Sequence, residues 1–492
     1  MGKLPTINSL WSLLTIALLI IVLALTFWGN SQNVAPSFIY IDEQITYYPI
    51  QKILHPSTWS EFFWLVGDGS DYRYGRILWN SMALAALIPE IIWGSTGQII
   101  AGRELQVVLL LSAYLLLVKT LIKSNILQFL LLLTLIFAPY NSYFMSMPKS
   151  EPMMLFCTAC FIYFYKKESL LLGRPYWIFC GLAFGAKISF LPLLAIFLIS
   201  SISINFDMRH KYHCVKKCLL TLLYLLIGFA LANPYFLMPA FFLLYPFTLL
   251  MAIFYFLQPL KKGGIYIFIG IIGVALGTLV TLSPLREYVF NDLSHLIGLR
   301  HALIEWFHAT FLRINDGNGE PTIRFSNWLA YYATVLYSSW PFFGYIYLAT
   351  SVLLLTTLLP KKINLIPHRS QRSQEIFIIP TLIYLAGISL VLSPMISVHN
   401  RIWGMYLFLG TIFILIGIFA SLDKTIRIER YACRKIKIAS NIPLLLNLFL
   451  VGLTLYFLIM NWLPKFIDDM LVLANRPLLE YQQPLPPRLV GI

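Results

Sequence analysis

Three carboxylates stand where the chain enters or leaves long apolar stretches. Asp42 and Glu43 are adjacent and follow the first apolar stretch, and Glu151 precedes a later one. A carboxylate within hydrogen-bond reach of a hydroxyl can act as a general base, and a second carboxylate can hold the hydroxyl or a divalent metal. We therefore predict Asp42, Glu43 and Glu151 as catalytic residues, with Asp42 as the base.

The acidic pair also permits a simpler interpretation. Asp is a favourable N-cap residue, and Glu suits the first turn of a helix because the helix dipole places partial positive charge there. Asp42 and Glu43 could thus do no more than begin a helix. The sequence leaves this alternative open.

Four basic residues are candidates for binding a phosphate group. A guanidinium fork binds phosphate oxygens in pairs, and a lysine ammonium binds them as a point charge. Positive charge in a site of low dielectric stabilises a phosphate that leaves during a reaction. A structural ion pair is the alternative for each of them. The four predicted phosphate-binding residues are Arg73, Arg103, Lys187 and Arg401.

A separate group of residues has the spacing of a metal site. His301, Glu305 and His308 are four and three residues apart, so they share one face if this segment is helical. They could hold a divalent metal, although solvated surface histidines are the alternative. No four-ligand zinc pattern, Walker loop or dinucleotide-binding glycine motif is found in the sequence, so nucleotide chemistry has no support.

The elements that position these residues must be membrane helices. Of the 492 residues, 59% are hydrophobic and only 12% are charged, about half the charged share of a soluble domain. The first apolar stretch, 10–28, follows Lys3 and is longer than a signal-peptide core. We interpret it as a retained signal anchor, with cleavage as the alternative.

The distribution of charge predicts the topology. Lys and Arg cluster between apolar stretches, and these clusters mark cytoplasmic loops, whereas most Asp and Glu fall on the other side. The amino terminus is therefore predicted to be cytoplasmic, and the three carboxylates extracytoplasmic. The net charge of +15 reflects a basic rim that faces anionic membrane lipids, and nucleic acid is a poor explanation for it. The clusters lie at 119–123, 166–174, 209–217, 261–262, 361–372 and 424–437.

We predict an all-α polytopic membrane protein with about thirteen transmembrane helices. The spans expected are 9–28, 103–121, 125–145, 151–166, 176–187, 188–205, 218–237, 240–259, 264–284, 338–359, 376–396, 402–420 and 443–462. Residues 1–462 form one domain, with long outer loops at 29–102 and 285–337. Amphipathic helices on the membrane surface are expected at 59–66 and 77–93. The alternative for 77–93 is a further span, which would reverse the side of all later loops. Residues 463–492 form an extracytoplasmic tail.

One apolar stretch, 176–204, is too long for one span, and Gly185, Ala186 and Lys187 interrupt it. Two short arms that meet at Lys187 keep the next basic cluster cytoplasmic. Lys187 is then recessed in the membrane, which costs about 2.5–3.5 kcal/mol unless it faces a wet cavity or an anionic partner. We favour the cavity, and a lysine that extends to the interface is the alternative.

In order along the chain, these residues resemble the GT-C glycosyltransferases. These are polytopic enzymes that use polyprenyl-phosphate sugars, and they include protein mannosyltransferases and bacterial aminoarabinose transferases. Asp42-Glu43 is similar to the family's Asp-Glu motif after the first helix. Arg73 before Trp79 is similar to a lipid-phosphate-binding residue, although Lys is expected there. Glu151-Pro152 is similar to a second acidic site that is usually Asp, and Gly181 to Lys187 resembles a glycine-rich turn that ends in Lys.

The resemblance covers residues 9–205, and beyond them it extends to topology, with His399-Asn400-Arg401 before a span. It implies an inverting transfer of a sugar from a polyprenyl-phosphate donor to a hydroxyl on a glycan, lipid or protein. It also implies a bacterial inner-membrane protein with its active site in the periplasm. The alternatives are a lipid-glycan polymerase or ligase with a diphosphate-linked donor, and a lipid transporter or flippase without chemistry.

Overall fold

The computed structural model describes residues 7–32, 41–56, 76–139, 141–168, 171–187, 190–205, 211–232, 349, 408–432 and 441–475. Within these ranges the chain is helical and contains no β-strand, which agrees with the predicted all-α class. The predicted spans at 240–259, 264–284 and 376–396, and all of 338–359 except Ala349, lie outside the described residues.

The described helices form two groups along the chain. The amino-terminal group is α1 (Ile7–Asn30), α2 (Ile41–Leu54), α4 (Arg76–Trp93), α5 (Ser95–Leu121), α6 (Asn125–Phe137), α7 (Asn141–Ser146), α8 (Ser150–Lys167), α9 (Trp177–Ala186), α10 (Leu191–Asn205) and α11 (Lys211–Ala232). The carboxy-terminal group is α20 (Phe408–Ala432), α21 (Asn441–Phe457), the π-helical turn η8 (Leu458–Trp462) and α22 (Leu463–Asn475).

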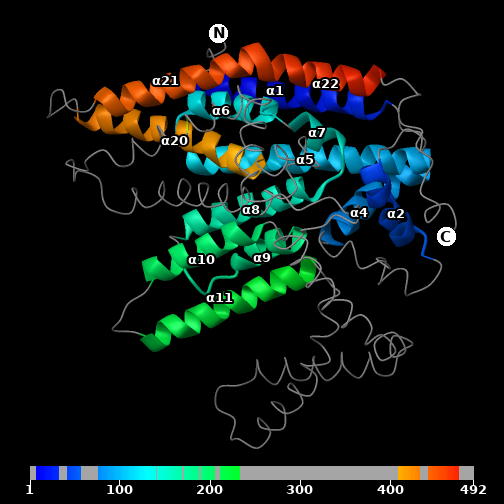
Figure 1. Cartoon of the computed structure of the whole chain (residues 1–492), viewed down its shortest axis with the longest axis horizontal. Helices are drawn as coiled ribbons and strands as arrows, with labels where there is room; N and C mark the ends of the chain where they lie inside the picture. Colours follow the sequence, from blue (N-terminus) through cyan, green and yellow to red (C-terminus); the bar gives the residue numbers. More distant parts are fainter. Residues whose placement is uncertain are drawn as a thin grey trace, which may run out of the picture.

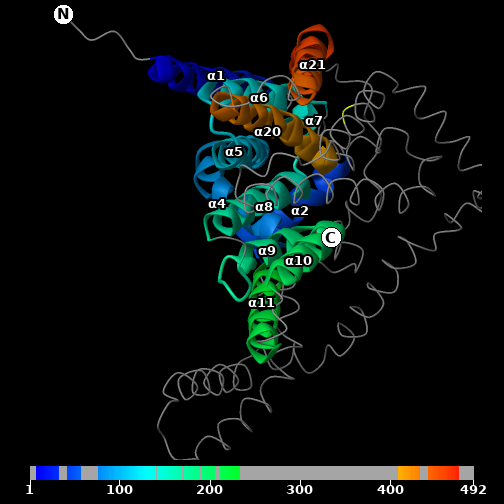
Figure 2. The same ribbon diagram turned by 90° about the vertical axis from the view of Figure 1, so that its left-hand side faces the viewer.

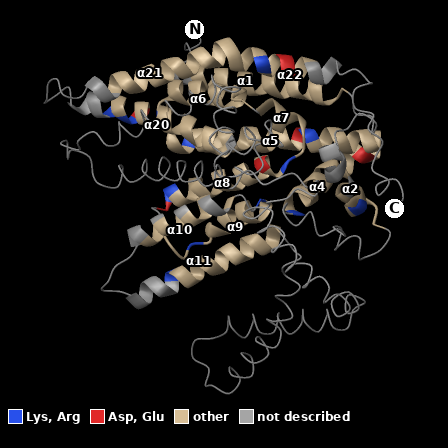
Figure 3. Cartoon of the chain, in the orientation of Figure 1, with Lys and Arg blue, Asp and Glu red and all other residues tan. Residues whose placement is uncertain are grey.

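Four of the described helical stretches are long and apolar enough to cross a membrane. They are Leu10–Asn30, Ser95–Leu121, Leu409–Arg427 and Leu444–Leu471. Figure 3 shows that most of each helix is uncharged, and that a few Lys, Arg, Asp and Glu positions interrupt α5, the start of α8 and the start of α22. These helices indicate a membrane protein, and the count of about thirteen spans stays a prediction.

The helices lie roughly side by side in a stack, which Figures 1 and 2 show from two directions. At one side, α1 packs against α6 and α22, and α20 packs against both α6 and α21. Helix α5 lies in the middle, α8 packs on it, and α9 and then α11 follow. The two ends of the described chain thus share one layer.

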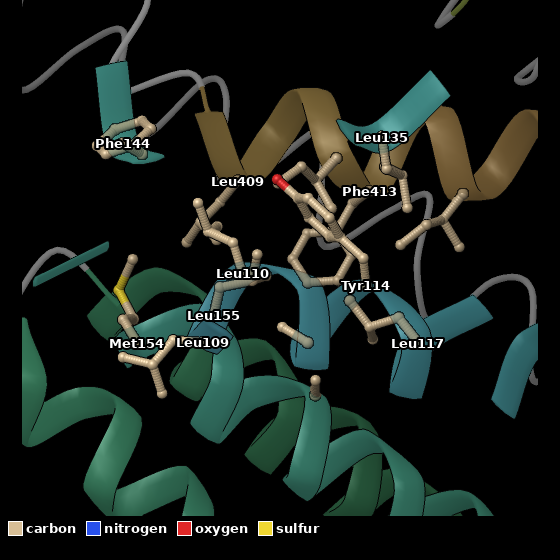
Figure 4. Packing of buried hydrophobic residues seen from close by; sticks show 14 of the residues in the cluster. Leu109, Leu110, Tyr114, Leu117, Leu135, Phe144, Met154, Leu155, Leu409 and Phe413 are labelled. Atoms are coloured by element: carbon tan, nitrogen blue, oxygen red, sulfur yellow. The ribbon is translucent and has the colours of Figure 1, made fainter. Parts of the chain in front are cut away.

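The packed interior between α5, α8 and α20 is built from large apolar side chains. Leu110 of α5 lies close to Leu155 of α8 and Leu409 of α20 in Figure 4. Tyr114 is fully buried, and its hydroxyl donates to Asn141 Oδ1 at 2.6 Å. Lipid tails are as apolar as leucine side chains, so the hydrophobic effect does not drive helices together within a bilayer. Close packing and interhelical hydrogen bonds stabilise such a bundle instead.

The predicted span 125–145 is interrupted in the structure. Helix α6 ends at Phe137, and α7 begins at Asn141. Ala138, the residue before Pro139, has φ −56° and ψ 150°, an extended conformation. Proline disfavours the helical conformation in the residue before it and cannot donate a backbone hydrogen bond, which explains the break.

Helix α5 begins eight residues earlier than predicted, so the end of the predicted outer loop is helical. Gly94, with φ 62°, makes the tight turn between α4 and α5. A Cβ on Gly97 would lie 2.1 Å from Pro89 O, so α4 folds back closely along α5. The helix predicted at 77–93 is present as α4. Its outer face is apolar, because Leu84, Ile88 and Ile91 are exposed there.

The predicted hairpin with its break at Lys187 is present. The ring of Phe161 in α8 contacts both Trp177 at the start of α9 and Phe197 within α10, so the chain goes out and returns along the same neighbour. Residues 181–186 are helical rather than a turn, and Gly181 serves packing. A Cβ there would lie 2.2 Å from Leu225 O of α11, a contact that only glycine permits.

The last predicted span continues beyond Trp462 as helix. Pro464 has no N–H to donate to the preceding turn, and the five residues before Leu463 form the π-helical turn η8. Helix α22 then extends to Asn475, into the segment predicted as a tail. The prolines at 484, 486 and 487 lie outside the described residues.

Candidate functional site

Glu151 and Lys187 form a buried ion pair. Helix α8 begins at Ser150, so Glu151 lies in its first turn, where the helix dipole favours a carboxylate. Helix α9 runs antiparallel to α8 and ends at Ala186; the next residue, Lys187, has an extended backbone with φ −156° and ψ 125°. The Lys187 ammonium donates to Glu151 Oε1, and the two side chains are only 13% and 9% exposed.

This pair shows how the charge of Lys187 is balanced within the bundle. Of the situations predicted for Lys187, the structure contains an anionic partner, and the side chain does not extend to the surface. Glu151 Oε2 is also buried and has no hydrogen-bond partner within the described part of the chain. A buried acceptor without a partner costs about 1–3 kcal/mol, so such an atom calls for a water or ligand donor.

Arg103 has a structural task at the same end of the bundle. Its guanidinium is 3% exposed and donates from Nη1 to Asn30 O at 2.9 Å and to Gln32 O at 3.3 Å. These carbonyls lie at the end of α1, where backbone acceptors lack partners within the helix. Arg103 therefore caps α1. This role is structural, whereas the sequence predicted that Arg103 binds phosphate.

Further polar contacts join α1, α5, α7 and α22 at this end. The amide of Asn30 donates to Glu104 Oε1 at 2.8 Å and to Met145 O at 2.9 Å. Ser142 Oγ donates to Asp469 Oδ2 at 2.5 Å. We call the end of the bundle that contains Asn30, Arg103, Glu104, Glu151 and Lys187 the Glu151 end.

Helix α2 carries the predicted acidic pair. Asp42 and Glu43 are the second and third residues of α2, which is also what the helix-start alternative predicts. Helix α2 packs against α4, and the hydroxyl of Tyr47 donates to Ile99 O at 2.8 Å. A Cβ on Gly102 would lie 2.9 Å from the Tyr47 hydroxyl, so α2 lies against the part of α5 next to Arg103.

The remaining predicted site residues are not placed. Arg73, Arg401, His301, Glu305 and His308 lie outside the described residues, so their predicted roles stay predictions. In the described ranges, no group of three His, Cys, Asp or Glu side chains could hold a metal.

Further buried polar residues, besides Asn30, were not predicted from the sequence. Gln106 in α5 and Ser150 in α8 are fully buried, and Arg76 at the start of α4 is 5% exposed and donates to Asn80 Oδ1 at 3.2 Å. A glutamine in the predicted span 103–121 is a visible signal, because polar side chains in membrane helices are costly and face the bundle interior. Ser150 carries no such signal, since it lies at a helix end.

The opposite end of the bundle contains segments that the charge pattern predicted to be cytoplasmic. The Asp423 carboxylate of α20 accepts the backbone N–H of Lys123 at 3.3 Å and of Ser124 at 3.1 Å, and it pairs with Arg427 at 2.9 Å. The Lys166 ammonium donates to Thr120 O at 2.5 Å. We call this the Asp423 end.

Comparisons with known proteins do not assign the chain to a family. No protein-family model matches the sequence, and no curated protein matches it significantly.

Proposed function

We propose that the protein is an extracytoplasmic glycosyltransferase that moves a sugar, with inversion, from a polyprenyl-phosphate donor to a hydroxyl. The observation that carries the proposal is the Glu151–Lys187 pair, in which a lysine and a carboxylate predicted separately as site residues meet in a buried position. Charged groups inside membrane bundles are expensive, and they commonly mark functional sites.

The other described candidates lie at the same end. Arg103 lies one turn before Gln106 on α5, and α2, which carries Asp42 and Glu43, packs beside Gly102. Of the motifs that resemble those of GT-C enzymes, the Asp42-Glu43 segment, Glu151 and Lys187 thus lie on described elements that pack near the Glu151 end. This convergence supports the proposal independently of the resemblance.

In the proposed reaction, the Asp42 carboxylate accepts the proton of the acceptor hydroxyl, and Glu43 orients the hydroxyl or Asp42. The hydroxyl oxygen then forms a bond to the anomeric carbon on the face opposite the phosphate. The bond between that carbon and the phosphate oxygen breaks, its electron pair stays with the phosphate, and the configuration inverts. The lipid phosphate leaves as an anion.

Lys187 and the predicted arginines stabilise the departing phosphate. In the resting protein the Lys187 ammonium is held by Glu151, so a phosphate that approaches it must share this donor with the carboxylate. The pair keeps a positive charge positioned in a region of low dielectric, where it has its greatest effect on a developing anion.

Glu151 does not fit the alternative role of a metal ligand. Its carboxylate binds the Lys187 ammonium, which would repel a divalent cation. No step of the proposed reaction passes through a metal.

Asp42→Asn tests the proposal. In lipid nanodiscs with a radiolabelled polyprenyl-phosphate sugar and envelope extract as acceptor, this variant should lose transfer, because the amide cannot accept the proton. Asp468→Asn is the matched control, since Asp468 is an exposed carboxylate on α22. Unchanged transfer by Asp42→Asn would exclude Asp42 as the base.

The same assay distinguishes the alternative functions. Transfer from a diphosphate-linked donor, and not from the monophosphate, would indicate a lipid-glycan polymerase or ligase. Movement of the lipid between leaflets without release of sugar would indicate a flippase. Either result would overturn the proposed reaction.

A further inference from the structure

Four buried polar atoms at the interface of α5 and α8 have no hydrogen-bond partner in the described ranges. They are Gln106 Nε2, Gln106 Oε1, Ser150 Oγ and Glu151 Oε2. Gln106 and Ser150 are fully buried, and Glu151 is 7% exposed. Buried polar side chains nearly always have a partner, so a cluster of this kind is unusual.

The packing of the two helices places these residues at one level. Leu109 and Leu110 of α5 lie beside Met154 and Leu155 of α8 in Figure 4. The contact between Lys166 and Thr120 further along shows that the helices run in the same direction. One helical turn back from these leucines on α5 is Gln106, and one turn back on α8 are Ser150 and Glu151.

The donors and acceptors of these three side chains indicate which hydrogen bonds a ligand must form. Gln106 supplies two N–H donors and an acceptor, Ser150 both donates and accepts, and Glu151 Oε2 accepts. Because Lys187 balances the charge of Glu151, the group carries no net charge. At Oε2, Glu151 would repel an anion and Lys187 would repel a cation, whereas a neutral hydroxyl group can both donate and accept; the donor phosphate is proposed to bind at the Lys187 ammonium instead.

We propose that Gln106, Ser150 and Glu151 form a binding subsite for a hydroxyl group of a neutral, polyhydroxylated ligand. The inference deepens the proposed function and rests on it for the ligand's role, which is that of the sugar acceptor. In addition to the phosphate-binding role proposed for it, Lys187 fixes Glu151 through Oε1 and leaves Oε2 for the acceptor. The chemistry is shared by water, so the test must separate water from a sugar hydroxyl.

The first experiment does not depend on transfer activity. Ser150→Cys in nanodiscs is treated with a small, membrane-impermeant thiol reagent, and the modified residue is identified by mass spectrometry. Thr158→Cys is the matched control, because Thr158 is also fully buried on α8 but its hydroxyl is bonded to Met154 O at 2.7 Å. We expect the thiol introduced by Ser150→Cys to react and the thiol introduced by Thr158→Cys not to react.

Competitors then identify what occupies the subsite. We expect glucose or mannose to slow the labelling of the Ser150→Cys variant, and inorganic phosphate and magnesium to leave it unchanged. Labelling that no sugar slows would mean a subsite for water alone, and the absence of labelling would mean closed packing. Protection by phosphate or magnesium would mean a charged ligand. Each of these three results overturns the inference.

A pair of glutamine variants provides a second test. Gln106→Leu removes an amide that has no partner in the described ranges, so the thermal unfolding temperature should stay the same or rise. In the control, Gln98→Leu removes an amide that donates to Glu90 Oε1 at 2.5 Å, so the unfolding temperature should fall. A fall for Gln106→Leu equal to that for Gln98→Leu would show that Gln106 has a structural role.

Kinetics separate failure of the inference from failure of the proposed function. Loss of one buried hydrogen bond to the ligand should raise the KM for the acceptor extract about tenfold in Gln106→Leu, with the KM for the donor unchanged. An unchanged acceptor KM in an active transferase overturns the subsite alone. If wild-type protein transfers no sugar but glucose still slows labelling, the subsite stands and the proposed reaction fails.

Discussion

At the scale of single residues, the Glu151 end combines structural and chemical roles that residue type alone does not separate. Arg103 and Lys187 were both predicted to bind phosphate. Arg103 caps the end of α1, whereas Lys187 pairs with a carboxylate that has a second oxygen without a partner in the described ranges. The roles of Arg103 and Lys187 differ because their partners differ, and those partners come from other helices. The sequence does not show which residues of other helices will lie beside them.

The buried pair makes a prediction about stability. Lys187→Met leaves the Glu151 carboxylate buried without its charge partner, which should lower the free energy of unfolding by about 3–5 kcal/mol. The double variant Glu151→Gln with Lys187→Met should recover most of this loss, because no charge stays unpaired. Chemical unfolding in detergent measures both variants in a double-mutant cycle.

An exposed pair is the control for this cycle. Lys465 and Asp469 on α22 lie 3.3 Å apart with side chains 71% and 35% exposed, so solvent screens them. Lys465→Met should change the free energy of unfolding by less than about 1 kcal/mol. Equal losses for Lys187→Met and Lys465→Met would show that the Glu151–Lys187 pair is not effectively buried.

At the scale of elements, apolar length and charge pattern predict where helices occur but not how they end or meet. The first span, the hairpin break at Lys187 and the helix at 77–93 are present in the structure. The break at Pro139 was missed because the apolar composition continues across it, and α5 begins at Ser95 because Gly94 permits a tight turn. The close contact of Gly181 with α11 could not be predicted from the sequence around Gly181, because it depends on how a second helix packs.

The contact between α9 and α11 is a test at this scale. Gly181→Ala should destabilise the protein, because the added methyl group would lie 2.2 Å from a backbone oxygen and would force the helices apart. Gly452→Ala is the control, since no atom lies within 4 Å of the added Cβ and alanine favours a helix by about 1 kcal/mol. In detergent, the thermal unfolding temperature should fall for Gly181→Ala and should not fall for Gly452→Ala.

At the scale of the whole molecule, segments predicted to share a side of the membrane meet at one end of the bundle. Loop residues near Lys123, the end of α8 and Asp423 gather at one end, and the end of α1, the start of α8 and the break after α9 gather at the other. This convergence agrees with the predicted grouping of segments by side, whereas the side that is cytoplasmic stays a prediction.

Reporter fusions test that topology. Alkaline phosphatase folds only outside the cytoplasm, so a fusion after Asn475 should be active in bacterial cells, and a fusion after Lys167 should be inactive. Green fluorescent protein at the same two positions should give the opposite pattern. Phosphatase activity after Lys167 would contradict a cytoplasmic Asp423 end.

The bond from Asp423 to the backbone of Lys123 and Ser124 also has a consequence for biosynthesis. The partners are 300 and 299 residues apart, so at about 5–20 residues per second the ribosome needs about 15–60 s to supply the carboxylate. During that interval α1, α5 and α6 are already synthesised, yet α20 and α22, which pack against them, are not. A nascent chain that stops early therefore exposes helix faces that membrane proteases and chaperones can recognise.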